Sequence, residues 1–427
     1  MSKALKLTKS IVLITSLFFL WGFVHNLNPI LIPHLKKACQ LSDFQSAFVD
    51  SAFFIAYFTM ALPAGYYLRK FGYKSGIVFG LLLFATGAFL FFPAAGTRTY
   101  EFFLVALFVI ASGLTFLETA ANPYIAALGS PETAAQRLNL AQSFNGLAAT
   151  LAPLAGGLFI LSGETLAATE EADLSAAQLQ SQLQTEADAV KIPYLIIGAV
   201  VLFVALLVSR TKLPHIEERQ NSKRENFSDR SMLANSNFIF GVVALFFYVG
   251  AQVGVVSFFI RFSGHVAGIP EKTAATLLSI ALLGFMIGRF SGTWLMRVVT
   301  PAKLLMLFAL VSIVFTLLAV GMDGLSAVYA MMGVVFLMSI MFPTIFSLAI
   351  QGLGHQTKQG SSILIMAIVG GAVLPPMMGW LSDRFTIQTA YLVPAGCFVI
   401  VWLFASRGCR SCPRPLSNGM CSSAEQH

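Results

Sequence analysis

Apolar runs of about twenty residues recur along the whole 427-residue chain, and they constrain its fold more than any other feature. A helix needs about 20 apolar residues to cross the hydrocarbon of a bilayer. Charged residues make up only 11% of the chain, against about 25% in soluble domains, which argues against a soluble enzyme, a disordered protein or a coiled coil. The runs are continuous rather than alternating, which argues against a transmembrane β-barrel. The sequence therefore predicts an all-α integral membrane protein in the lipid bilayer.

The apolar runs predict twelve transmembrane helices, over residues 11–33, 45–68, 75–95, 100–128, 138–162, 192–209, 236–260, 272–297, 301–320, 325–351, 359–381 and 387–406. Residues 163–191, rich in Ala, Gln and Glu, are expected to form a short surface helix. Residues 210–235 carry both charge signs and separate six spans from six. We therefore predict an N-terminal six-helix half (1–209), a cytoplasmic linker (210–235), a C-terminal six-helix half (236–406) and a disordered tail (407–427).

Lys and Arg residues are distributed unevenly between the two sides of these spans. Nineteen fall on the side of the N-terminus and seven on the opposite side, and one lies inside a span. The positive-inside rule then places both termini in the cytoplasm. The same rule accounts for the net charge of +8, so we expect no nucleic-acid partner. The first apolar run is too long for the core of a cleavable signal peptide.

The two halves carry similar helix-breaking residues at corresponding places. Span 4 contains Asn122-Pro123 and span 10 contains Phe342-Pro343, as in a duplicated transporter, although chance matching of Gly and Pro is an alternative. The sequence shows no P-loop, no dinucleotide-binding glycine motif and no HExxH zinc motif. The Cys409-x-x-Cys412 spacing has no second ligand pair, so no metal site is predicted. We therefore expect transport driven by an ion gradient, with neither enzymatic activity nor a cofactor.

Three ionisable residues lie within or near the predicted spans. Glu118 is in span 4, where a charge is costly, so it must face protein or a wet cavity and is the candidate for binding and releasing the coupling proton. Asp50 lies near the outer end of span 2, and two roles are open for it: an ion-coupling group, or a solvated residue at the helix end. Arg289, in span 8, is expected to reach the cytoplasmic interface or to cap a neighbouring helix end.

Neutral polar side chains in the spans suggest a polyhydroxylated solute, because an amide both donates to and accepts from a sugar hydroxyl. Interhelical hydrogen bonding is the alternative for any one of them. In span 5, Asn139, Gln142 and Asn145 recur every three residues and share one helix face. Aromatic stacking faces could come from Phe116, Phe144, Tyr248 and Trp380. The candidate substrate-binding residues are His25, Asn26, Asn28, Asn122, Gln142, Asn145, Tyr248 and Gln252.

Several segments resemble one transporter family. They are 26–33 (NLNPILIP), 117–124 (LETAANPY), 137–145 (RLNLAQSFN), 248–252 (YVGAQ) and 288–294 (GRFSGTW). Together they resemble the major facilitator superfamily, and within it the bacterial fucose/glucose/galactose:H⁺ symporter family. The resemblance implies twelve helices in two pseudo-symmetric halves, alternating access, and cation-coupled sugar uptake through the bacterial inner membrane. It also implies coupling by Glu118 and sugar contacts from Gln142 and Asn145.

One departure from the family bears on the substrate. The L-fucose member carries an Asp after the Asn-Leu-Asn of span 1, whereas this chain has Pro29. Asp50 could take over part of that role. We therefore expect a monomeric symporter for a neutral hexose, namely glucose, galactose or N-acetylglucosamine, with protons as the coupling ion. L-fucose:H⁺ symport, sodium-coupled symport and an uncoupled facilitator or exporter are the alternatives.

Overall fold

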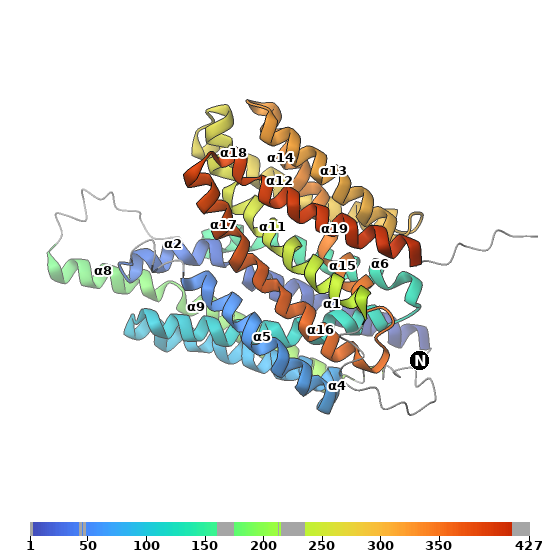
Figure 1. Ribbon diagram of the computed structural model, residues 1–427. Helices are drawn as coiled ribbons and strands as arrows, with labels where there is room; N and C mark the ends of the chain where they lie inside the picture. The colour runs from blue at the N-terminus through green and yellow to red at the C-terminus, as the bar shows by residue number, and fades with distance from the viewer. Residues whose placement is uncertain are drawn as a thin grey trace, which may run out of the picture.

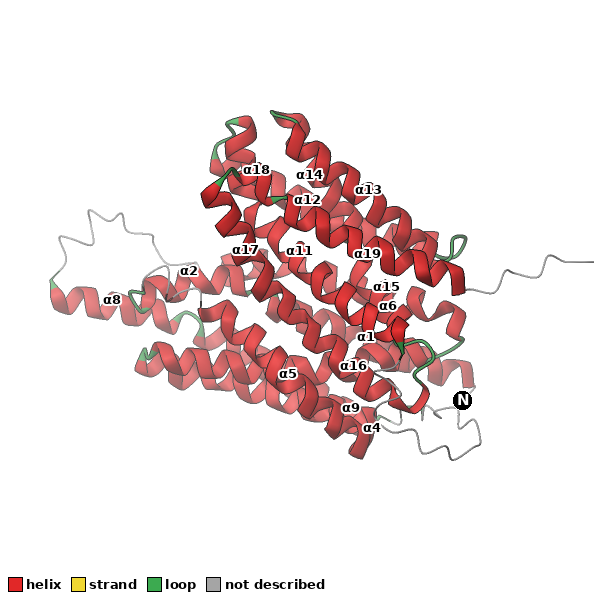
Figure 2. Cartoon of the chain, in the orientation of Figure 1, coloured by secondary structure: helices red, strands yellow, loops and turns green. Residues whose placement is uncertain are grey.

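The computed structural model describes residues 3–41, 45, 48–159, 175–211, 213–214 and 235–411. Helices joined by turns account for these residues, and no strand occurs among them (Figure 2). The helices are α1 (Lys3–His25), α2 (Asn28–Ala38), α4 (Phe48–Thr97), α5 (Tyr100–Ala127), α6 (Ala134–Phe159), α8 (Ala176–Asp188), α9 (Lys191–Arg210), α11 (Ser236–Ala267), α12 (Glu271–Leu295), α13 (Pro301–Gly321), α14 (Leu325–Met338), α15 (Met341–Ala349), α16 (Thr357–Met366), α17 (Gly370–Arg384), α18 (Ile387–Ala390) and α19 (Leu392–Ser411). Three short 3-10 turns join some of them, η1 (Pro131–Thr133), η2 (Gly354–Gln356) and η3 (Ala367–Val369). The all-α prediction is confirmed.

The helices account for twelve spans. Nine helical segments of the described chain are long and apolar enough to cross a membrane. One of these segments, within α4, contains two spans, because Gly72 leaves the helix with φ 81° and ψ 170°. Glycine adopts positive φ at little cost because it has no Cβ. The pair α1 and α2 supplies one further span and α6 supplies the other, so twelve spans are present as predicted.

Breaks inside the spans coincide with the residues that interrupt helices. Asn26 and Leu27 form a turn between α1 and α2, directly ahead of Pro29 in the first turn of α2. Proline has no N–H and crowds the carbonyl one turn earlier, so the preceding helix ends there. Span 10 breaks between α14 and α15, just ahead of Pro343. In span 11, Gly370 allows a close helix crossing, since a Cβ there would overlap the carbonyl oxygen of Phe246.

The spans form two groups, which Figure 1 shows in blue to green and in yellow to red. The N half consists of α1 to α9, in which α4 packs on α5 and α9, and α1 packs on α6. The C half consists of α11 to α19, in which α19 packs on α11 and α13. The two halves meet mainly where α6 lies against α12 and α15, and where α16 lies against α4 and α5. Of the predicted linker 210–235 and tail 407–427, all but residues 210–211, 213–214, 235 and 407–411 lie outside the described residues.

The two ends of the bundle differ in charge. We call the end that carries Arg69, Lys70, Lys74, Arg137 and Arg297 the basic end. At the opposite end, the expected surface helix is α8, which packs on α2. There the Lys37 ammonium lies 2.6 Å from a carboxylate oxygen of Glu186.

The outer faces of the bundle are apolar. On α13, the side chains of Leu307, Leu310, Val314 and Leu317 recur every three or four residues and are each about half exposed. Such a stripe is the lipid-facing side of a transmembrane helix, since hydrocarbon surrounds it.

Candidate functional site

Among the described residues, three buried hydrogen bonds join the N half to the C half. In the first, Asn139 Nδ2 of α6 donates to Thr344 Oγ1 of α15, at 3.1 Å. In the second, Ser361 Oγ of α16 donates to the carbonyl oxygen of Thr119 in α5, at 2.9 Å. The third is made by Arg289 and is described below. Gly65 of α4 lies close to α16, because a Cβ at this glycine would overlap the Ser362 hydroxyl. Gly65 is one turn from Arg69, so the halves are in contact near the basic end.

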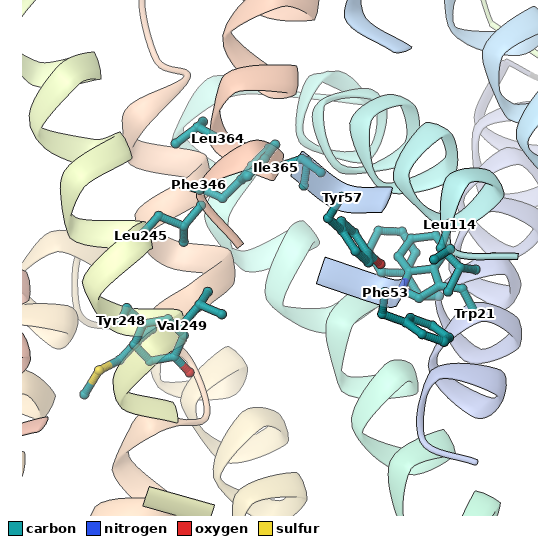
Figure 3. Packing of buried hydrophobic residues seen from close by; sticks show 14 of the residues in the cluster. Trp21, Phe53, Tyr57, Leu114, Leu245, Tyr248, Val249, Phe346, Leu364 and Ile365 are labelled. Atoms are coloured by element: carbon teal, nitrogen blue, oxygen red, sulfur yellow. The ribbon is translucent and has the colours of Figure 1, made fainter. Parts of the chain in front are cut away.

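Glu118 forms a buried pair with a tyrosine of the neighbouring span. Tyr57 Oη of α4 donates to Glu118 Oε1 of α5 over 2.5 Å, and the two residues are 3% and 8% exposed. Figure 3 shows Tyr57 beside Phe53, Leu114 and Trp21 in the N half. No Lys, Arg or His in the described part of the chain lies within ion-pair distance of Glu118. The carboxyl is therefore held by a neutral donor, and its charge is not balanced by an adjacent cation.

One helical turn from Glu118, two amides meet. Gln142 Nε2 of α6 donates to Asn122 Oδ1 of α5 over 3.3 Å, and both side chains are buried. The Asn122 Nδ2 and Asn139 Oδ1 atoms are buried and have no hydrogen-bond partner in the described structure. Leaving buried amide atoms unpaired is costly. Hydrogen bonds from a bound group to these atoms would therefore contribute favourably to its free energy of binding. Asn145 lies one turn further along α6, half-buried, with its side chain against Gly22 of α1.

The candidates of span 1 lie where α1 ends. His25 is exposed, and its ring meets the Phe53 ring edge-on with centroids 5.5 Å apart. Asn26 is half-buried and its amide donates to the carbonyl oxygen of Gly22, at 2.7 Å. The side chains of Asn28 and Asp50 lie outside the described residues.

The candidates of span 7 differ in their surroundings. Tyr248 is fully buried in the C half (Figure 3). Its hydroxyl donates to the carbonyl oxygen of Met338 at 2.7 Å. Its polar atom is thus bound to the end of α14 in this conformation. Gln252, one turn further along α11, is half-buried. Of the proposed stacking residues, Trp380 is 54% exposed at the edge of a hollow lined by Met377 and Leu381, so it faces outward.

Arg289 links the two halves instead of reaching solvent. Its side chain is 5% exposed, and its Nε atom donates to the carbonyl oxygen of Ser339, the C-cap residue of α14, at 2.8 Å. A terminal nitrogen of the guanidinium donates to the carbonyl oxygen of Gln142 in the N half, at 2.7 Å. The expectation of a helix-capping role is confirmed, and that of a side chain reaching the interface is wrong. The four last carbonyls of a helix lack partners within it, which gives the guanidinium a binding site inside the protein.

Sequence reasoning did not single out Tyr57, Thr344 or Ser361. Each is an ordinary residue within an apolar run, and only the packing of helices distant in sequence brings it to Glu118, Asn139 or Thr119. Within the described residues, no three His, Cys, Asp or Glu side chains gather so as to hold a metal ion. The side chains of Cys409 and Cys412 lie outside the described part of the chain.

Comparison with known proteins identifies the family. A profile of the Major Facilitator Superfamily matches residues 13–368. The chain is 42% identical over 400 residues to the glucose/galactose transporter of Brucella abortus biovar 1 (strain 9-941), covering 93% of each protein. It is also 42% identical over 400 residues to the L-fucose-proton symporter of Escherichia coli (strain K12), covering 92% of this chain and 91% of that one.

Solved structures agree with this assignment. The crystal structure of the superfamily transporter FucP in the outward conformation superposes with a TM-score of 0.87 at 40% identity, covering 94% of this chain and 99% of that one. The proton:xylose symporter XylE bound to 6-bromo-6-deoxy-D-glucose, at 13% identity, matches with a TM-score of 0.71 over 95% of this chain and 96% of that one, which shows a shared fold. The chain therefore belongs to the major facilitator superfamily, a family of multi-pass membrane transporters and not of enzymes.

Proposed function

We propose that this chain is a secondary active transporter that couples protons to the uptake of a neutral hexose across the bacterial inner membrane. The observation that carries the proposal is the buried Tyr57–Glu118 pair, one turn from the Asn122–Gln142 amides at the junction of the halves. A carboxyl without an adjacent cation can bind and release a proton as its surroundings change. The names of the relatives, a glucose/galactose transporter and an L-fucose-proton symporter, support the same substrate class and ion.

Glu118 is the group that we assign to proton coupling. Tyr57 donates to it from a neighbouring helix, and a phenol can donate both to a carboxylate and to the carbonyl oxygen of a carboxylic acid. The pair can therefore persist in either protonation state. Movement of α4 against α5, or water entering beside them, would change the stability of the charged form and so drive binding or release. Asp50 is a second candidate, two turns before Tyr57 on the same helix.

Sugar recognition is assigned to the amides on α5 and α6. Asn122 Nδ2 has no partner in the described structure, and Gln142 lies beside it. A sugar hydroxyl can accept from the first and donate to or accept from the second. Asn145 extends the same face of α6 toward α1, where Asn26 and His25 lie. Gln252 would complete the site from the C half.

The position of the contacts between the halves supports transport by alternating access. The hydrogen bonds made by Asn139, Arg289 and Ser361 join the halves nearer the basic end, and the fold superposes on an outward transporter. We assign the basic end, and with it both termini, to the cytoplasm on the distribution of Lys and Arg. In this assignment the structure is outward-facing, and sugar and proton enter from the opposite end. We expect the chain to act as a monomer without a cofactor.

The testing experiment is uptake into proteoliposomes. Glucose, galactose, N-acetylglucosamine and L-fucose would be offered as labelled sugars, with proton and sodium gradients imposed separately. We expect accumulation of one of the first three sugars with the proton gradient alone. Accumulation only with sodium would assign the other ion. Equilibration without accumulation under either gradient would make the chain a facilitator, and preferential uptake of L-fucose would show that the carboxylate replaced by Pro29 is not what sets recognition.

Glu118→Gln tests the coupling step within the same assay. Gln mimics the neutral carboxylic acid and can still accept from Tyr57, so the structure of the pair is kept. We expect sugar exchange between the two sides to survive and gradient-driven accumulation to be lost. Accumulation at the wild-type level in this variant would exclude Glu118 as the coupling group.

A further inference from the structure

A hollow lies between the two halves at the basic end. Its volume is about 180 Å³, and it lies between α6 and α12, away from Glu118 and the amides. Its walls include Gln136, Arg137 and Leu140 of α6, Phe290 and Trp294 of α12, and Arg297 just beyond the end of α12. One wall therefore belongs to each half of the protein.

The lining residues change from apolar to aromatic to basic toward the basic end, matching the order of acyl chain, interface and phosphate in a phospholipid. Along α12, Phe290 is followed one turn later by Trp294 and then by Arg297, in the direction of the basic end. The helix α6 begins at the basic end, so Arg137 in its first turn lies at the level of Arg297. Leu140, one turn later in α6, lies deeper in the bundle. Hydrocarbon, interface and phosphate levels of a leaflet attract apolar residues, Trp and Arg in that order.

The apolar residues of the hollow are exposed on the outer surface of the bundle. Leu140 is 42% exposed, Phe290 is 39% exposed and Trp294 is 63% exposed. Phe290 also packs against Phe144 of α6, whose ring it meets edge-on with centroids 6.3 Å apart. An acyl chain lying along these side chains would bury apolar area on both halves at once.

The charged residues supply two cationic groups at the mouth. The Arg137 guanidinium donates to the carbonyl oxygens of Ile125, Ala126 and Ser130, and it interacts electrostatically with the Glu132 carboxylate. Arg297 is exposed, and its side chain makes no hydrogen bond or ion pair to the described part of the chain. A guanidinium presents several donors in one plane, which suits the oxygens of a phosphate.

We propose that this hollow binds an anionic phospholipid, with its acyl chain along Leu140, Phe290 and Trp294 and its phosphate at Arg297. Basic pockets between transmembrane helices on the cytoplasmic side hold anionic headgroups in this way. The lipid touches both halves only while α6 and α12 are together at the basic end. It therefore stabilises the conformation in which that end is closed, because a ligand favours the state to which it binds more tightly.

The opposite end of the C half provides a matched control. There Arg384 stacks on Trp380, with its guanidinium carbon 4.6 Å from the ring centroid, beside a hollow lined by Met377 and Val393. Arg297→Gln and Arg384→Gln each remove one positive charge that lies next to an exposed Trp. Any loss of lipid binding caused by net charge alone would therefore be the same in both variants.

The test is native mass spectrometry of the purified protein with phosphatidylglycerol or phosphatidylcholine of identical acyl chains. We expect wild type and Arg384→Gln to retain phosphatidylglycerol in preference, and Arg297→Gln to retain about five-fold less of it. Trp294→Ala should lower retention of both lipids, because it shortens the apolar wall. Equal retention by the two Arg variants, or no preference for the anionic lipid in wild type, would overturn the proposal. The measurement does not depend on transport, so its failure is distinguishable from failure of the proposed function.

Discussion

Two buried hydroxyls hold the halves together nearer the basic end, and removing both should open that end. Thr344 Oγ1 accepts from Asn139 across the interface, and Ser361 Oγ donates to the carbonyl oxygen of Thr119. Thr344→Val and Ser361→Ala delete the hydroxyls with little change in shape. The Asn139 amide keeps its bond to the carbonyl oxygen of Ala135, so the partner groups are not left wholly unpaired.

The expected size of the effect follows from the number of bonds lost. A buried hydrogen bond contributes about 0.5–1.5 kcal/mol net, and interhelical bonds in membranes average about 0.6 kcal/mol. In the double variant, the conformation with the basic end closed therefore loses about 1–3 kcal/mol of stabilisation relative to the open conformation. That corresponds to a shift of about 5–150-fold in the ratio of the closed to the open state.

The assay is the distance distribution between spin labels placed on the two halves at the basic end. Lys70 of α4 and Thr300, ahead of α13, are both exposed and suit cysteine labelling, with the five native cysteines replaced by serine. We expect the double variant to gain a population at longer distance. The matched control is Ser312→Ala with Thr316→Val, since these two buried hydroxyls bond only within α13.

A double variant whose distances match those of wild type would refute the assignment of these bonds to the closure of the basic end. A control variant that opens equally would show that deleting any two buried hydroxyls loosens the bundle, and it would refute the assignment just as well. Thermal denaturation of all three proteins separates a change of conformation from a loss of fold.

Three further predictions concern the proposed site. Tyr57→Phe removes the hydroxyl that donates to Glu118 in the described structure, so it should change the pH dependence of sugar accumulation while leaving the melting temperature near wild type; an unchanged pH profile would count against the pair. Gln142→Ala should weaken sugar binding by about 1–3 kcal/mol, measured by calorimetry, because a sugar hydroxyl loses its partner; reduced yield with unaltered affinity would indicate a packing role instead. Asp50→Asn should lower uptake and alter its pH or sodium dependence, whereas normal uptake at every pH and sodium concentration would identify a solvated helix end.

The sequence alone determined the class of fold and most of the helices. Apolar run length decides whether a segment spans a bilayer, and this property is local, so all twelve spans follow from reading along the chain. Breaks at Pro29 and Pro343 are local too, because proline lacks an N–H wherever it occurs. The cost of a charge in hydrocarbon singled out Glu118 without knowledge of any neighbour.

The tertiary structure decided which side chains meet. A helix surrounded by lipid and protein is apolar on nearly every face, so its sequence does not reveal how it is rotated about its axis. That rotation brings Tyr57 to Glu118, buries the Tyr248 hydroxyl against α14 and directs Arg289 into the other half instead of toward solvent. The same rotation places Arg297 and Trp294 on a shared wall with α6. Spacing within a helix fixes which residues share a face, but only the packing of one half on the other determines what that face contacts.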